Sequence, residues 1–227
     1  MRIITYATHK DNFNLQFLKE KLNIELLEEL LPWGDMWQGK YYYDFYARAY
    51  STHQFVSSLD PEELVVMMDA YDVLPLNNCS PESLENKIKS CFDINKVTFC
   101  AESNCFPEAS LAEKYPDQSY MWKYLNAGIF AGKAKAINLM LSITLPKISG
   151  SMDQLEFSNL FLESDLINLD YECNIFQSLF TDNSTRNIHW DHYEVKEKTI
   201  KNKIHNTYPL LFHGNGGIDM SELVQFI

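Results

Sequence analysis

The sequence has little cysteine, few basic residues and no long apolar run. Five of its 227 residues are cysteines, and no two of them form a Cys-x-x-Cys pair. An odd number of unclustered cysteines argues against both a zinc ribbon and a disulfide framework, so reduced thiols are expected. No run approaches the roughly 18 apolar residues of a membrane-spanning helix. We therefore expect no membrane insertion.

Basic residues are outnumbered by acidic residues, 19 to 31, which gives a formal net charge of -12. A surface with that charge repels the phosphates of nucleic acids and of anionic lipids. Nucleic-acid binding is therefore not expected. An anionic ligand can still bind where the acidity is locally neutralised, for example by a divalent cation. The question is which acids lie close enough together to hold one.

The length and composition favour one globular domain, residues 1–227. Apolar residues make up 46% of the chain and charged residues 22%, which allows a core without disulfides. No internal repeat and no low-complexity linker is visible. The apolar stretch within the first eight residues is too short for the hydrophobic region of a signal peptide. On these grounds we expect a cytoplasmic location.

Strand-like runs alternate with helix-like segments through the first hundred residues. Strands are predicted at 3–8, 64–68, 97–101, 127–130 and 210–213, where β-branched or aromatic residues gather in short apolar runs. Helices are predicted at 11–22, 44–59, 80–91 and 153–162, the third opened by Ser80 and Pro81. This alternation indicates an α/β fold with a mostly parallel sheet and a less regular second half. Ligands of such sheets bind beyond the carboxyl ends of the strands.

Two aspartates at the end of a predicted strand are the clearest chemical signal. Asp69 directly follows the run at 64–68, and Asp72 comes three residues later, so one turn can bring both carboxylates to one point. Close carboxylates repel each other unless a proton or a cation lies between them. Oxygen ligands of this kind suit Mg²⁺ or Mn²⁺. Aspartate is also the ordinary turn residue, so the pair by itself fits a turn without a metal better.

A histidine ends another predicted strand and is followed by a glycine-rich turn, His213-Gly214-Asn215-Gly216-Gly217. Glycines let backbone N–H groups face phosphate oxygens. An imidazole nitrogen is a ligand that Mn²⁺ tolerates better than Mg²⁺. An isolated histidine is more often structural, but together with Asp69 and Asp72 it completes a candidate metal site.

Two further segments contain candidate site residues. Asn126 lies among small residues in a predicted strand, where the backbone either passes close to a ligand or forms a glycine-kinked core strand. Asp153 opens a predicted helix, where it is either a base that faces an acceptor or an acid favoured by the helix dipole. The residues by themselves leave both pairs of alternatives open.

Seven short motifs follow one another along the chain. They are Met68–Val73, Ala101–Glu108, Leu111–Pro116, Tyr124–Gly128, Asp153–Leu155, Leu169–Gln177 and His213–Gly216. In this order they resemble the glycosyltransferase domain of the procollagen lysyl hydroxylases, and the resemblance runs from about Ile3 to Gly217. It implies a GT-A fold that binds a UDP-sugar through Mn²⁺, with Mg²⁺ as an alternative. It also implies transfer of a hexose to an acceptor hydroxyl.

The resemblance assigns roles to individual residues. Asp69, Asp72 and His213 are the implied metal ligands. The residues implied to contact the nucleotide, the diphosphate or the sugar are Thr8, Trp37, Tyr71, Gly214, Asn215 and Gly216, with Lys40 or Arg48 as the basic residue that meets the diphosphate. Glu102, Asn126 and Asp153 are the implied catalytic and sugar-facing residues. The expected donor is UDP-glucose or UDP-galactose, and the acceptor is a hydroxylysine-type protein side chain, a glycan or a small molecule.

The sequence departs from the family pattern beside the expected acceptor site. A run of aspartates before Gln154 and Leu155 is reduced here to Asp153, and an expected tryptophan is replaced by Phe106. The first departure bears on the specificity for sugar or acceptor more than on the metal. The second keeps an aromatic wall but loses an N–H donor.

Other functions compete with this interpretation. His189-Trp190-Asp191 has the His-x-Asp form of an iron(II) site, with His205 or His213 as a third ligand, but three-residue motifs are common by chance. A zinc site at His189 and His192 lacks cysteines or a second histidine pair nearby. A catalytically inactive GT-A-like binding module and a UDP-sugar hydrolase are the remaining alternatives.

Overall fold

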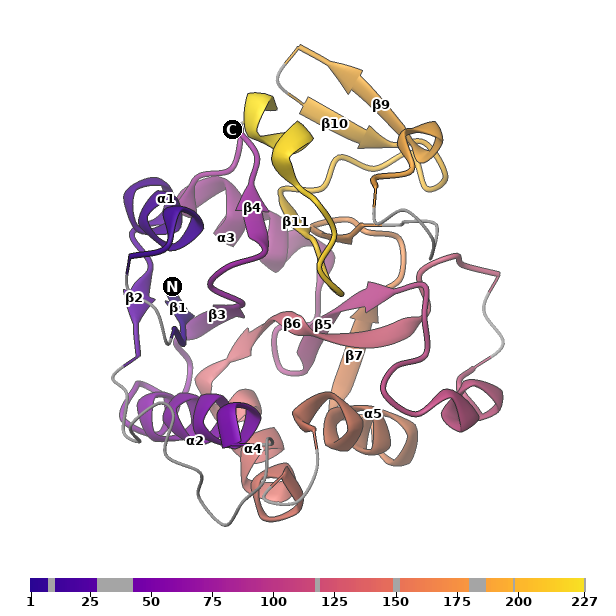
Figure 1. Cartoon of the computed structure of the whole chain (residues 1–227). Helices are drawn as coiled ribbons and strands as arrows, with labels where there is room; N and C mark the ends of the chain where they lie inside the picture. Colours follow the sequence, from indigo (N-terminus) through magenta and orange to yellow (C-terminus); the bar gives the residue numbers. More distant parts are fainter. Residues whose placement is uncertain are drawn as a thin grey trace.

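The computed structural model describes residues 1–7, 11–27, 43–116, 119–148, 152–179, 187–197 and 199–226. A six-stranded sheet lies at its centre (Figure 1). Its strands, in spatial order, are β2 (Glu25–Leu26), β1 (Arg2–Thr5), β3 (Leu64–Met68), β6 (Tyr124–Lys133), β5 (Val97–Glu102) and β7 (Ile167–Asp170). Strand β6 runs antiparallel to both of its neighbours, and the other pairings are parallel. The α/β prediction is confirmed, with a mixed central sheet.

Helices cover both faces of this sheet (Figure 1). On one face lie α2 (Tyr43–Ser57), α4 (Ala134–Ile148) and α5 (Asp153–Glu163), and on the other α1 (Phe13–Leu22) and α3 (Pro81–Cys91). Successive side chains of a strand point to opposite faces, so Val65 and Met67 pack under the first group while Val66 and Met68 pack under the second. The short apolar runs of the sequence are therefore buried on both sides, as predicted.

A three-stranded sheet lies next to the central one and completes the site. It has the order β4 (Val73–Pro75), β11 (Leu211–His213) and β8 (Phe176–Ser178). Because only four residues separate the end of β3 from the start of β4, the turn between them carries both Asp69 and Asp72. His213 at the end of β11 pairs with Val73 on one side and with Ser178 on the other. This register brings the histidine to the aspartate turn.

The remaining described elements follow β5 in the chain. They are the antiparallel hairpin of β9 (Tyr193–Lys196) and β10 (Thr199–Asn202), and the 3₁₀ helices Ala109–Lys114, Trp190–His192 and Ser221–Phe226. The hairpin packs against the three-stranded sheet through Tyr193, Ile200 and Phe212. No helix in the described part of the chain is long and apolar enough to cross a membrane.

Local sequence explains where the predicted helices begin. The predicted start of α3 at Ser80 and Pro81 is confirmed, and it is a capping box: the hydroxyl of Ser80 accepts the backbone N–H of Ser83, and the hydroxyl of Ser83 accepts that of Ser80. The carboxamide of Asn12 caps the N-terminus of α1, so this helix begins at Phe13. Strand β6 is longer than the predicted 127–130, and α4 is a helix that the sequence patterns did not indicate.

Candidate functional site

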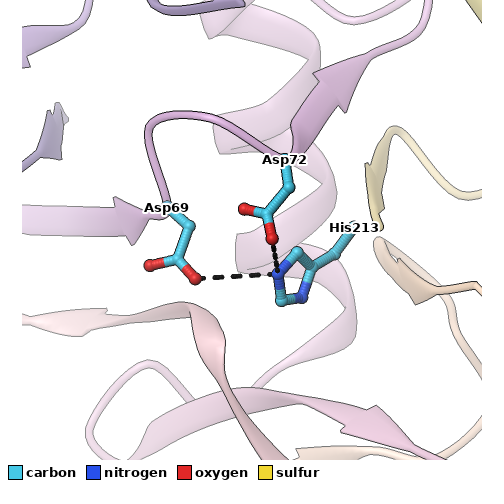
Figure 2. Close-up of side chains that lie close together, drawn as sticks. All are labelled: Asp69, Asp72 and His213. Atoms are coloured by element: carbon cyan, nitrogen blue, oxygen red, sulfur yellow. Dashed lines mark ion pairs between the residues drawn. The ribbon is translucent and has the colours of Figure 1, made fainter. Parts of the chain in front are cut away.

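Asp69, Asp72 and His213 converge at the junction of the two sheets. One potential ligand atom from each lies within 4.8 Å of the other two. Nε2 of His213 is 3.6 Å from Oδ2 of Asp69 and 3.4 Å from Oδ2 of Asp72 (Figure 2). Two carboxylate oxygens and one imidazole nitrogen suit Mn²⁺, so the donor set fits the implied ion. The residues predicted as metal ligands are thus brought together.

Backbone contacts hold this group in place. The N–H of Asp69 donates to the carbonyl oxygen of Gly128 at 2.8 Å, and the N–H of Gly214 donates to that of Asp72 at 2.8 Å. The imidazole of His213 lies directly over Gly128, where a Cβ atom would come within 2.1 Å of Cε1. The backbone approach expected around Asn126 is therefore an approach to the His213 imidazole, and it requires glycine at position 128.

Charges within the site perturb one another. Burial opposes ionisation of His213, but the two aspartates outweigh it and raise the pKa of the imidazole. Burial also opposes ionisation of Asp72, yet His213 and Arg48 lower the pKa of this carboxyl. For Asp69, burial dominates and raises the pKa despite the nearby Arg48. Nδ1 of His213 is buried and has no hydrogen-bond partner among the described residues. A divalent cation between these groups would relieve the repulsion of the two carboxylates.

Arg48 on α2 connects the candidate ligands to helix α5. Its guanidinium donates to Oδ1 of Asp69 and to Oδ2 of Asp153, the latter contact including Nε at 3.1 Å. Oδ2 of Asp69 stays directed at His213, so the two oxygens of Asp69 serve different partners. Arg48 was one of two candidates for the base that meets the diphosphate. The other, Lys40, lies outside the described residues.

A pocket of about 390 Å³ opens beside these residues. The predicted residues that line it are Arg48, Asp69, Asp72, Glu102, Asn126, Asp153, His213, Asn215 and Gly216. Gln154, Met152, Leu179 and Ile218 also contribute to the lining, and the sequence patterns gave them no role of their own. Phe106 lies at the pocket and is 53% exposed, in keeping with the aromatic wall expected there.

The two other acids of the pocket differ in their surroundings. Burial raises the pKa of Glu102 to about 7, although amide groups of Asn126, Gln154 and Asn215 donate to its carboxylate and oppose the shift. Asp153 lies in the first turn of α5, where its carboxylate accepts the backbone N–H of Gln154 at 2.7 Å and the guanidinium of Arg48. Asp153 is thus both a first-turn acid and a pocket residue.

Other predicted residues lie elsewhere or cannot be placed. Tyr71 is partly buried against Ala7, Leu15 and Ala70 and does not line the pocket. Gly214 also lies outside the lining and faces Met220, whose sulfur would be 2.6 Å from a Cβ at this position. Thr8 and Trp37 lie outside the described residues.

The described residues do not form the iron site or the zinc site considered at His189, Asp191 and His192. Within the part of the chain that the structure describes, Asp69, Asp72 and His213 form the one group of three or more metal-ligating side chains. His189 stacks on His192 at a ring-centroid distance of 5.6 Å, and His192 and His205 pack against Trp122. These histidines are part of an aromatic cluster.

Comparison with known families places the chain. The family model described as the PLOD GT domain matches residues 1–226. The chain belongs to the PLOD GT domain family. This confirms the resemblance inferred from the motifs and makes the chain a glycosyltransferase domain, hence an enzyme.

Relatives of this PLOD GT domain include a viral and a human protein. The chain is 37% identical over 161 residues to uncharacterized protein R699 of Acanthamoeba polyphaga mimivirus, covering 71% of this chain and 33% of that protein. It is 31% identical over 228 residues to the human multifunctional procollagen lysine hydroxylase and glycosyltransferase LH3, covering 94% of this chain and 29% of LH3. The chain thus spans about a third of the length of these relatives.

The PLOD GT domain also has a structural neighbour. A glycosyltransferase involved in the glycosylation of the major capsid of PBCV-1 superposes with a TM-score of 0.57 and 11% identity, covering 95% of this chain and 94% of that one. At this identity the likeness concerns the fold alone, and it agrees with the predicted GT-A architecture.

Proposed function

We propose that this PLOD GT domain transfers a hexose from a UDP-sugar, UDP-glucose or UDP-galactose, to an acceptor hydroxyl, with Mn²⁺ bound by Asp69, Asp72 and His213. The convergence of these three side chains at the edge of a polar pocket is the observation that carries the proposal. Family membership supports the class of reaction. The name of the human relative, which couples lysine hydroxylation to glycosyl transfer, supports an acceptor of the hydroxylysine type, with a glycan or a small molecule as the alternatives.

The metal ligands and Arg48 have different proposed roles in the pocket. When bound, the cation would neutralise the diphosphate and stabilise the charge that develops on the leaving UDP. Asp69, Asp72 and His213 would hold it, and Arg48 keeps Oδ1 of Asp69 engaged so that Oδ2 faces the ligand position. Arg48 lines the same pocket, and we assign it the contact with the diphosphate.

Glu102 is the carboxyl best suited to exchange a proton near neutral pH. Burial raises its pKa to about 7, and a group with a pKa near the working pH is an efficient acid or base. We propose that Glu102 accepts a hydrogen bond or a proton from a substrate hydroxyl. Asp153 is bound to Arg48 and to the N-terminus of α5, and we assign it to holding that basic residue beside the metal ligands.

The proposal is tested with radiolabelled UDP-glucose and UDP-galactose, in Mn²⁺, Mg²⁺ or a chelator, with and without hydroxylysine-containing peptides and simple glycans as acceptors. We expect label in the acceptor fraction only when a divalent cation is present, and none with Asp72→Ala. Release of free sugar at a rate that acceptors do not reduce would instead identify a UDP-sugar hydrolase. Absence of both transfer and hydrolysis, with no nucleotide binding, would overturn the proposal and favour an inactive module that binds a glycan or a protein.

A further inference from the structure

Three amide groups from three different elements surround the carboxylate of Glu102. Asn126 on β6 donates to Oε1 at 3.2 Å, and Gln154 on α5 donates to the same oxygen at 2.8 Å. Asn215, which follows β11, donates to Oε2 at 2.8 Å. Glu102 itself is 4% exposed at the end of β5. The carboxylate is therefore fixed by donors from the central sheet, from a helix and from the turn after β11.

Each of these amides is locked from its other end. The side-chain Oδ1 of Asn126 accepts the backbone N–H of Gly128, and the side-chain Oε1 of Gln154 accepts the backbone N–H of Ala127, both at 2.9 Å. An amide oxygen accepts while an amide nitrogen donates, so these contacts decide which end of each amide faces Glu102. A flipped amide would direct its oxygen at the carboxylate and would lose both hydrogen bonds.

The third amide is locked by a side chain instead of the backbone. The hydroxyl of Ser178 donates to Oδ1 of Asn215 at 2.6 Å. Ser178 lies on β8 and is 1% exposed, and its carbonyl oxygen accepts the indole N–H of Trp122 at 2.8 Å. The chain of contacts from Ser178 through Asn215 to Glu102 therefore joins the three-stranded sheet to the central sheet at the pocket. Of the three locks, this one can be removed without changing the backbone.

The two oxygens of Glu102 differ in how many donors they hold. Within the described residues Oε1 accepts two hydrogen bonds, whereas Oε2 accepts one, from Asn215. A carboxylate oxygen has room for about two donors. Oε2 thus keeps one acceptor position while Glu102 lines the pocket.

We propose that Ser178 is a positioning residue for glycosyl transfer: by locking the amide of Asn215 on Glu102, it keeps the remaining acceptor position of Oε2 directed at one hydroxyl of the donor sugar or of the acceptor. This inference rests on the proposed transferase function. Ser178 is not part of the pocket lining: its backbone pairs with that of His213 in the three-stranded sheet, and its hydroxyl reaches the pocket only through Asn215.

The test compares Ser178→Ala and Ser178→Thr with the matched control Ser51→Ala. Ser51 is also buried, but its hydroxyl has no hydrogen-bond partner among the described residues. For Ser178→Ala we expect a loss of roughly tenfold in kcat, in the range that misplaced groups produce, with unchanged Mn²⁺ affinity. Ser178→Thr keeps the hydroxyl and should recover most of the rate, and Ser51→Ala should behave as the wild type.

The pH dependence separates positioning from simple packing. The hydrogen bond from Asn215 favours the charged form of Glu102, so weakening it should raise the pKa of this carboxyl. We expect the midpoint of the acidic limb of kcat/KM to move upward in Ser178→Ala and to return in Ser178→Thr. Carboxyl ¹³C NMR of Glu102, assigned with Glu102→Gln, measures the same shift without turnover.

The outcomes distinguish the two proposals. If Ser178→Ala keeps the wild-type rate and the wild-type Glu102 titration, Ser178 only fills space and the inference is wrong. If Ser178→Thr is as impaired as Ser178→Ala, the hydroxyl is not the active feature and the inference is again wrong. If the wild type neither transfers nor hydrolyses any UDP-sugar, the proposed function fails, while the NMR titration still decides whether Ser178 positions Glu102.

Discussion

Replacement of Gly128 by alanine should damage the metal site through a single added methyl group. The new Cβ would lie 2.1 Å from Cε1 of His213, 2.6 Å from Nε2 and 2.7 Å from Nδ1, whereas ordinary contacts begin at 3.4 Å. The imidazole must therefore withdraw by about 1.3 Å. Metal–ligand distances tolerate errors of only about 0.2 Å. We expect the Mn²⁺ affinity to fall by about 10- to 100-fold, the usual effect of disturbing a ligand's support.

The measurement is a titration of Mn²⁺ into the protein without nucleotide, by calorimetry or by electron paramagnetic resonance of the free ion. Gly132→Ala is the matched control, because this glycine lies on the same strand and a Cβ there would come 2.9 Å from the backbone oxygen of Lys96. Both variants should lose stability, by about 1–3 kcal/mol from overpacking. Only Gly128→Ala should lose metal affinity. Equal Mn²⁺ affinity in the two variants would refute the assignment of His213 as a ligand.

Two further predictions concern the charges of the pocket. Arg48→Met leaves the 2%-exposed carboxylate of Asp153 without its charged partner, so the free energy of unfolding in urea should fall by about 3 kcal/mol. Asp153→Asn in the same chain should restore much of this stability. A fall below about 0.5 kcal/mol would contradict the pairing. The pKa of Glu102 is about 7 in the folded state, against an ordinary value of 4.5, so this carboxyl binds a proton more tightly in the folded state. Its contribution to the free energy of unfolding should therefore be complete below pH 4.5 and be lost as the pH rises through 7. Unfolding free energies of wild type and Glu102→Gln measured from pH 4 to 8 check this, since the decline should be smaller in the variant by the part that Glu102 contributes between pH 4.5 and 7.

Strand-end chemistry was the part of the site that the sequence could predict. Asp69 and Asp72 follow an apolar run directly, and His213 ends another, so their position at a sheet edge follows from local patterns. Their meeting depends on the pairing of β11 with β4, which joins residues far apart in the chain. This pairing is not visible in local patterns, and the three residues were grouped from the sequence because the order of the motifs resembles a known family. Thr8, Trp37, Lys40 and the single-domain assignment remain predictions.

The supporting contacts of the site could not be predicted in the same way. Ser178 ends a three-residue strand and carries no sequence signal, because its role depends on Asn215, which reaches it from the turn after β11. Gln154 was visible only as a member of a motif, although its amide connects β6 to Glu102. Such contacts depend on distances between segments, which periodicity and spacing do not encode.

Two features of the fold show a similar limit. The burial of Ile137, Leu141 and Thr144 follows helical spacing along α4, but Pro146 near its end and the β-branched residues weaken the helix signal. Packing against α2 and α5 stabilises this helix in spite of its sequence. The direction of β6 was equally hidden, because a buried strand has the same composition whether its neighbours run parallel or antiparallel.

The binding of UDP with and without a divalent cation tests the central claim most directly. Calorimetric titration of UDP into the wild type should show binding in Mn²⁺ and little or none in a chelator, because the acidic pocket repels an uncompensated diphosphate. Asp72→Ala should remain folded by circular dichroism and bind no UDP in either condition. Equal UDP affinity in Mn²⁺ and in chelator, or wild-type affinity in Asp72→Ala, would contradict the metal-dependent account.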